Sequence, residues 1–212
     1  MESAPRSREI GRPRVFSDEA IFHATRLVLQ RGGYPELTLE AIAQEVGCTR
    51  QALVRRFGSK QALILAYLDS MLSQMAANYS IVYSASQSPL AALRARFVAP
   101  PEERLEINED RAVQANVVAF MLTSSGDPAI SARYQALDQI FLDEMERLIR
   151  AAVDQDELRG VDPAALARTL FSASLGETVR WASTPGDDSL VSRLAEIFDL
   201  VTTPYRVLSP ES

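Results

Sequence analysis

The stretch TLEAIAQEVGCTRQALVRRFGSKQAL, residues 38–63, contains two short amphipathic segments separated by a glycine. Thr38 is a good N-cap for the first segment, whose apolar residues recur at the spacing of one helix face: Leu39, Ile42, Ala43 and Val46. Gly47 ends this helix, and Thr49 can cap a second helix over residues 50–57. Two short helices around a tight glycine turn predict a helix-turn-helix, in which the second helix enters the major groove of DNA.

The second helix of this pair has two chemically different faces. Positions 50, 51, 54 and 55 share one face, whereas Leu53 and Phe57 share another and anchor in the core. Arginine suits guanine and glutamine suits adenine, so Arg50 and Gln51, near the helix N-terminus, are expected to contact base edges. The predicted DNA-binding residues are Arg50, Gln51, Val54, Arg55, Arg56, Thr38, Thr49, Lys60, Arg12 and Arg14.

The members of this set that lie at helix starts are expected to contact phosphates rather than bases. Thr38, Thr49 and Lys60 lie at predicted helix starts, where hydroxyls, free backbone N–H groups and a point charge favour anions. Arg12 and Arg14 belong to a basic N-terminal arm that enters the adjacent minor groove or follows the backbone.

The same stretch closely resembles the DNA-binding signature of TetR-family regulators. The match lies in the threonine that opens the first helix, the Ile42-Ala43 pair, the turn glycine, the leucine and phenylalanine of the second helix, and the exit Phe57-Gly-Ser-Lys. Val54 and Arg56 depart from the family, which usually has two ring residues there. DNA binding is kept, with an altered operator preference, if Val54 packs on a thymine methyl group and Arg56 recovers the phosphate contact. The alternative is weaker binding.

The charge is divided unevenly along the chain of 212 residues. The net charge is −6, yet residues 1–60 contain ten Arg and Lys against seven acids, and the rest contains twelve against twenty-one. A basic segment can neutralise phosphates, while an acidic body is repelled from DNA. The distribution therefore predicts a single docking face at the N-terminal end.

Apolar residues recur at helical spacing nearly everywhere, which predicts an all-α fold of about nine helices. After a first helix from Ser17 to Gly32-Gly33, the two short helices and a long helix from Lys60, we expect helices at 89–98, 109–124, 128–154, 163–183 and 188–202. Residues 100–108 are expected to form a loop. The predicted domains are a flexible basic arm (1–14), a helix-turn-helix domain (15–60), a ligand-binding and dimerisation domain (61–204) and a tail (205–212).

Met and aromatic residues of the C-terminal domain are candidates for a ligand pocket, although ordinary core packing is the alternative for each. Asn116 falls on an otherwise apolar face, so it either bonds a neighbouring helix or offers a polar group to a ligand. The candidate pocket residues are Tyr67, Met71, Met75, Asn116, Phe120, Met121, Tyr134, Phe141 and Phe171.

The last two predicted helices suit a two-fold interface. The helix over 163–183 is rich in small residues that permit close approach, and that over 188–202 has an apolar side. The family resemblance implies the same arrangement, a four-helix bundle made from both helices of two subunits. The candidate interface residues are Leu166, Leu170, Ala173, Leu190, Leu194, Ile197, Phe198 and Val201.

Several other functions find little support in the composition. One cysteine, Cys48, excludes an internal disulfide, and one histidine, His23, leaves metal and histidine-base chemistry almost without residues. We therefore predict no enzyme, metal site or cofactor. The absence of a membrane-spanning stretch or secretory signal predicts a cytoplasmic protein without a membrane partner.

Together these features predict a homodimeric, sequence-specific repressor that binds double-stranded operator DNA and is released by an unidentified small-molecule effector. The alternative is a ligandless activator or DNA-organising protein on the same fold, with its cavity filled by side chains. The volume of the cavity distinguishes the two.

Overall fold

The computed structural model describes residues 16–85, 88–98, 110–124 and 126–207, and within these ranges it is all-helical. The N-terminal helices are α1 (Asp18–Glu36), α2 (Leu39–Val46), α3 (Arg50–Phe57) and α4 (Lys60–Ala85). The body adds α5 (Pro89–Val98), α6 (Arg111–Ser124), α7 (Pro128–Asp154), α8 (Pro163–Ser183) and α9 (Leu190–Thr202), and a 3₁₀ turn follows at Thr203–Tyr205. The predicted arm (1–14) and the loop over 100–108 lie outside the described residues.

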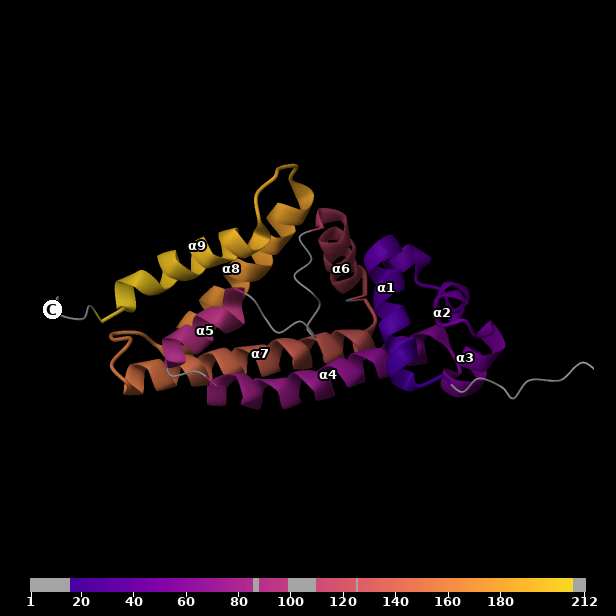
Figure 1. Ribbon diagram of the computed structural model, residues 1–212, viewed down its shortest axis with the longest axis horizontal. Coiled ribbons are helices and arrows are strands. Elements are labelled where there is room, and N and C mark those ends of the chain that lie inside the picture. The colour runs from indigo at the N-terminus through magenta and orange to yellow at the C-terminus, as the bar shows by residue number, and fades with distance from the viewer. Residues whose placement is uncertain (1–15, 86–87, 99–109, 125, 208–212) are drawn as a thin grey trace, which may run out of the picture.

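The molecule is elongated, with α2 and α3 at one end (Figure 1). The long helices α4 and α7 run side by side. Helices α8 and α9 form a hairpin that packs on α5 and α7, on the side away from α4. Arg133 on α7 holds α4 through two hydrogen bonds to Asp69, of 3.0 and 3.2 Å. Helix α6 stands between α1 and α8 and contacts both (Figure 1). It therefore joins the DNA-binding end to the rest of the body.

Two hydrophobic cores follow this division. The first contains the apolar faces of α1 to α4 and extends into the body through Phe120, Ile130 and Leu137. The second lies between α5, α7, α8 and α9, around Trp181 and Phe198. Because the first core includes residues of α6 and α7, the N-terminal helices are packed onto the body rather than attached by a linker.

Helix α1 differs from the prediction at its C-terminal end. It does not stop at Gly32-Gly33 but kinks at Gly33, whose φ of 65° is left-handed, and continues to Glu36. Glycine adopts this φ without strain, and Pro35 is tolerated because it stands in the first turn after the kink. The kink turns the last residues of α1 toward α6.

The chain after α9 is also more ordered than a tail. Tyr205 accepts a hydrogen bond from the backbone N–H of Arg159 (2.8 Å), and Val207 donates one to the carbonyl of Glu157 (3.0 Å). The guanidinium of Arg206 bonds Asp199 at 2.5 Å. The predicted tail over 205–212 is therefore anchored at least through residue 207.

Candidate nucleic-acid interface

The helix-turn-helix is positioned by local backbone signals. The Thr38 hydroxyl oxygen accepts the N–H of Ala41 (3.1 Å), and that of Thr49 accepts the N–H of Ala52 (3.2 Å). Gly47 ends α2 with a φ of 79°, which lets the chain turn directly into α3. Since a hydroxyl that accepts one bond can still donate another, both threonines remain able to bond phosphate.

One face of α3 is fixed in the protein. Leu53 is 1% exposed, and the ring of Phe57 lies 6.1 Å from that of Phe22 on α1. The opposite face carries Gln51 and Arg55, which are exposed and form no hydrogen bond or ion pair with the described residues. These two side chains are therefore open to a partner outside the protomer.

Arg50 is exposed but already paired. Its Nε lies 2.5 Å from a carboxylate oxygen of Glu40 on α2, and both side chains are more than half exposed. Exposed ion pairs of this kind contribute about 0–1 kcal/mol. A base or a phosphate of DNA can therefore replace Glu40 as the partner of Arg50 at small cost.

The two positions that depart from the family behave differently from the prediction. Val54 is partly buried and packs against the first core, so only part of its side chain stays open to a thymine methyl. Arg56 turns toward α1, where it pairs with Asp18 (2.7 Å) and donates to the carbonyl of Phe16 (2.6 Å). We therefore revise the expected phosphate contact of Arg56 to a link between α3 and the start of α1.

Lys60 opens α4 beside the helix-turn-helix. Its Nζ lies 4.1 Å from the centre of the Tyr34 ring, a cation–π contact, and burial lowers the pKa of its ammonium group. Ser59 caps α4 by accepting the N–H of Ala62 (3.1 Å). Gln61 reaches across to Asp127, the N-cap residue of α7, at 2.5 Å. The start of α4 is thus tied both to α1 and to α7.

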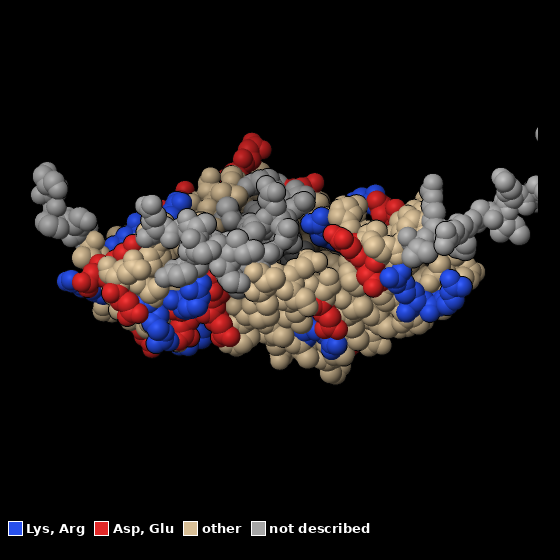
Figure 2. Space-filling view, turned by 60° about the horizontal axis from the view of Figure 1, so that its bottom comes forward, with Lys and Arg blue, Asp and Glu red and all other residues tan. Residues whose placement is uncertain are grey.

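Basic side chains gather at the end of the molecule formed by α2 and α3, with acidic side chains beside them (Figure 2). Residues 16–60 contain six Arg and Lys against five acids, whereas residues 1–15 contain four arginines against two acids. Most of the positive excess found in the sequence therefore belongs to the arm, including Arg12 and Arg14, which lies outside the described residues.

The body contains a cavity of about 250 Å³ between α4, α5, α7 and α8. Six of the nine candidate pocket residues line it: Met71, Met75, Met121, Tyr134, Phe141 and Phe171. The rings of Phe141 and Phe171 lie 5.6 Å apart in its wall. The methionine and aromatic residues noted in the sequence thus come together around one space.

The other three candidates lie elsewhere. Phe120 is 1% exposed and packs between the rings of Tyr34 and Tyr134, at 5.6 and 5.9 Å, as a core residue. Asn116 donates to the backbone carbonyl of Gln30 (2.9 Å), so of the two alternatives for this amide the structure has the bond to a neighbouring helix. Tyr67 lines a separate pocket.

Polar residues that the sequence reasoning missed also line the cavity, among them Arg96, Asp138, Ser174 and Thr178. Burial lowers the pKa of Arg96 to about 10, against the opposing effect of the Glu144 carboxylate, and burial raises the pKa of Asp138. Arg96 could have been noticed because it falls on the apolar face of its own helix, four residues after Ala92.

The candidate dimer residues divide in the same way. Five of them are nearly inaccessible because they form the second core of a single protomer: Leu166, Leu170, Leu190, Leu194 and Phe198. These five side chains therefore leave little surface for a contact with another copy. Ala173, Ile197 and Val201 are partly buried. The exposed apolar side chains of α8 and α9 are instead Leu175, Val179 and Leu200, at 38%, 39% and 77%.

Residues 21–67, from α1 to the first turns of α4, match the family model described as bacterial regulatory proteins, tetR family. No curated protein sequence matches the chain. Among solved structures, a TetR transcription regulator from Haloarcula marismortui is 19% identical with a TM-score of 0.72, covering 90% of this chain and 98% of that one.

Two further structures are similar over nearly their whole length. SmeT, the repressor of the multidrug efflux pump SmeDEF of Stenotrophomonas maltophilia, is 25% identical with a TM-score of 0.68, covering 93% of this chain and 95% of that one. The ketosteroid transcriptional regulator KstR2 of Mycobacterium tuberculosis is 17% identical with a TM-score of 0.62, covering 92% and 98%.

The fold and the exposed face of α3 define a helix-turn-helix transcription regulator. Within that class, residues 21–67 match the N-terminal domain of the tetR family, and the chain as a whole has the fold of solved TetR-family regulators. In the described ranges no helix combines the length and apolar character needed to cross a membrane.

Proposed function

We propose that this protein is a cytoplasmic repressor that binds a palindromic operator as a homodimer and is released by a small-molecule effector. The observation that carries the DNA-binding part is the exposed face of α3, where Gln51 and Arg55 have no partner among the described residues while Leu53 fixes the helix behind them. A helix held on one side and open on the other is the requirement for reading a major groove.

The dimer rests on the outer face of α8 and α9. One recognition helix reads only a few bases, so specificity requires two half-sites and a two-fold partner. Leu200 on α9 is 77% exposed, and Leu175 and Val179 on α8 are exposed as well. A second copy that covers this face would bury all three.

Two substitutions on α9 test this interface. Leu200→Asp should give a folded monomer in sedimentation, because the side chain touches solvent in the protomer. Leu194→Asp should unfold the protein instead, because a carboxylate would replace a leucine that is 4% exposed. A Leu200→Asp protein that stays dimeric would place the interface elsewhere.

The effector site is the 250 Å³ cavity of the body. Its aromatic and methionine walls suit an apolar or aromatic molecule, while Arg96 and Asp138 supply polar contacts. The ketosteroid regulator similar to this chain makes an apolar effector reasonable. The open volume favours a ligand-responsive regulator over the ligandless activator or DNA-organising protein. In a ligandless protein, side chains would fill the cavity.

Selection from a random duplex library tests the DNA-binding function directly. We expect enrichment of a palindrome whose half-sites lie about one helical turn apart. Gln51→Ala and Arg55→Ala should each weaken binding to the selected duplex, whereas Gln139→Ala, an exposed change on α7, should not. Failure to enrich any sequence, or equal binding by all variants, would contradict the proposal.

A further inference from the structure

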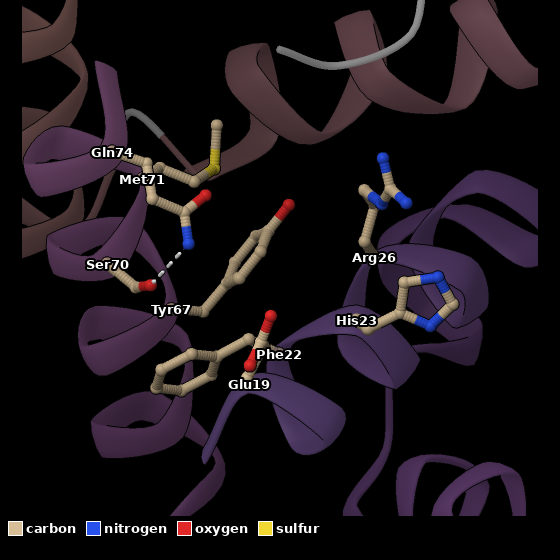
Figure 3. Close-up of a pocket in the computed structure, with 8 residues that line it drawn as sticks. All are labelled: Glu19, Phe22, His23, Arg26, Tyr67, Ser70, Met71 and Gln74. Carbon is tan, nitrogen blue, oxygen red and sulfur yellow. Dashed lines mark hydrogen bonds between the residues drawn. The ribbon is translucent and has the colours of Figure 1, made fainter. Parts of the chain in front are cut away.

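A second pocket, distinct from the main cavity, lies between α1 and α4 (Figure 3). Its volume is about 170 Å³, comparable with a cavity of about 150 Å³ that holds one benzene molecule in another protein. Met71 lines both spaces and forms the wall between them. The pocket is therefore large enough for a single ring and separate from the proposed effector site.

The hydroxyl of Tyr67 is the central polar group of this pocket. Tyr67 is only 6% exposed, and its hydroxyl points into the space between Met71 and Arg26 (Figure 3). It forms no hydrogen bond with the part of the chain that the structure describes. The oxygen is not among the fully enclosed polar atoms that lack a partner, which fits a hydroxyl that opens onto the pocket. It can therefore donate a hydrogen bond to a ligand there.

The charge near the hydroxyl favours an anionic acceptor. Burial raises the pKa of Tyr67 to about 12, and the positive charge of Arg26, which lines the same pocket, opposes that shift. Glu19, which also lines the pocket, is not among the groups that shift this pKa. An acceptor beside Tyr67 therefore meets a donor and a positive charge together.

The remaining walls suit a flat ring with a second polar group. Phe22 and Tyr67 stand with ring centres 6.3 Å apart, and Met71 adds a polarisable apolar surface. Glu19 supplies a hydrogen-bond acceptor for a donor at the other end of the ligand. On the α4 side, Gln74 is held by its bond to Ser70 (3.2 Å), drawn in Figure 3.

We infer that the α1–α4 pocket is a second ligand site, which takes a small aromatic carboxylate with its carboxyl group on Tyr67 and Arg26. A ligand there touches α1 of the DNA-binding end and α4 of the body at once. Its contacts differ from those of a molecule in the main cavity, so the two sites can be occupied independently.

Titration of the full-length protein with 4-hydroxybenzoate, followed by calorimetry or ligand-observed NMR, tests the site. We expect saturable binding in the millimolar range. The neutral isostere 4-hydroxybenzamide should bind about tenfold more weakly or not at all, because it loses the charge-assisted bonds. Tyr67→Phe and Arg26→Gln should each lower the affinity for 4-hydroxybenzoate by about tenfold. Circular dichroism establishes that the variants are folded, and the isosteric Tyr67→Phe keeps the test valid if Arg26→Gln does not fold.

Thr178→Val is the matched control, since it also removes one hydroxyl but from the main cavity. It should bind 4-hydroxybenzoate as the unchanged protein does. The inference is overturned if no binding occurs, if the amide binds as well as the acid, if Tyr67→Phe binds normally, or if Thr178→Val alone loses binding.

Discussion

Two regions of the molecule use arginine in different ways. At the helix-turn-helix, the side chain of Arg50 is 52% exposed and pairs with the single acid Glu40. At the start of α6, the side chain of Arg111 is 20% exposed and lies 4.2 Å from the Trp181 ring. It donates to the carbonyls of Thr184 (2.8 Å) and Gly186 (3.1 Å), to that of Trp181, and to the carboxylate of Asp188 (2.8 Å).

The difference separates an exchangeable contact from a fixed one. A single exposed pair contributes little to stability and can be replaced by another anion at small cost. A guanidinium that satisfies several backbone carbonyls at once cannot leave without exposing or orphaning them. Arg111 therefore belongs to the architecture of the α8–α9 turn, while Arg50 remains available to DNA.

The largest effect is expected from Arg111→Ala. Loss of the guanidinium removes the donor for the carbonyls of the turn between α8 and α9, so the free energy of unfolding should fall by about 3 kcal/mol. Urea denaturation measures it. Arg159→Ala, which breaks an exposed pair with Asp156, should change the value by less than about 1 kcal/mol. Similar losses in both variants would remove the distinction drawn between the two kinds of arginine.

A smaller effect, on DNA rather than on folding, is expected at α3. Arg50→Ala should cost about 2 kcal/mol on the selected duplex and relax its preference at one position per half-site. Arg55→Ala should weaken all sequences alike and lower the slope of log affinity against log salt by about 1 per contact, or about 2 per dimer. Binding to selected and scrambled duplexes across a salt series separates the patterns. If neither change matters, α3 does not face DNA.

The smallest effect is expected from Glu40→Gln. Since Glu40 competes with DNA for Arg50, its neutralisation should raise DNA affinity, by no more than about 1 kcal/mol because the pair is exposed. Fluorescence anisotropy at low salt measures this best. Glu196→Gln, an exposed change on α9, serves as the control for net charge alone. A lower affinity for Glu40→Gln would mean that Glu40 positions Arg50 for DNA rather than competing for it.

The helix-turn-helix could be predicted from sequence because its determinants are local. Thr38, Gly47 and Thr49 act within three or four residues of their own positions, and each has the predicted capping role. The helices of the body were likewise found to within a few residues, because proline and capping side chains mark their starts.

The partner of an apolar face is not a local property, and there the sequence was insufficient. The leucines of α8 and α9 have the spacing of a buried face, but periodicity does not tell whether the same protomer or a second copy covers it. In the structure Leu170 and Phe198 are covered by the protomer's own helices. Arg56 shows the same limit for charge, since its contact with Asp18 joins residues 38 positions apart.

The kink at Gly33 sets a condition on exchanging DNA-binding modules between regulators. A Cβ at this position would lie 3.0 Å from the side-chain oxygen of Asn116. The side-chain nitrogen of Asn116 donates a hydrogen bond to the backbone carbonyl of Gln30. A chimaera that joins the helix-turn-helix domain of another regulator to this body therefore needs a glycine at the position of Gly33. It also needs a backbone carbonyl three residues earlier that can accept the hydrogen bond from Asn116. The contact between the end of α1 and α6 thus decides whether two modules are compatible, although neither residue contacts a base.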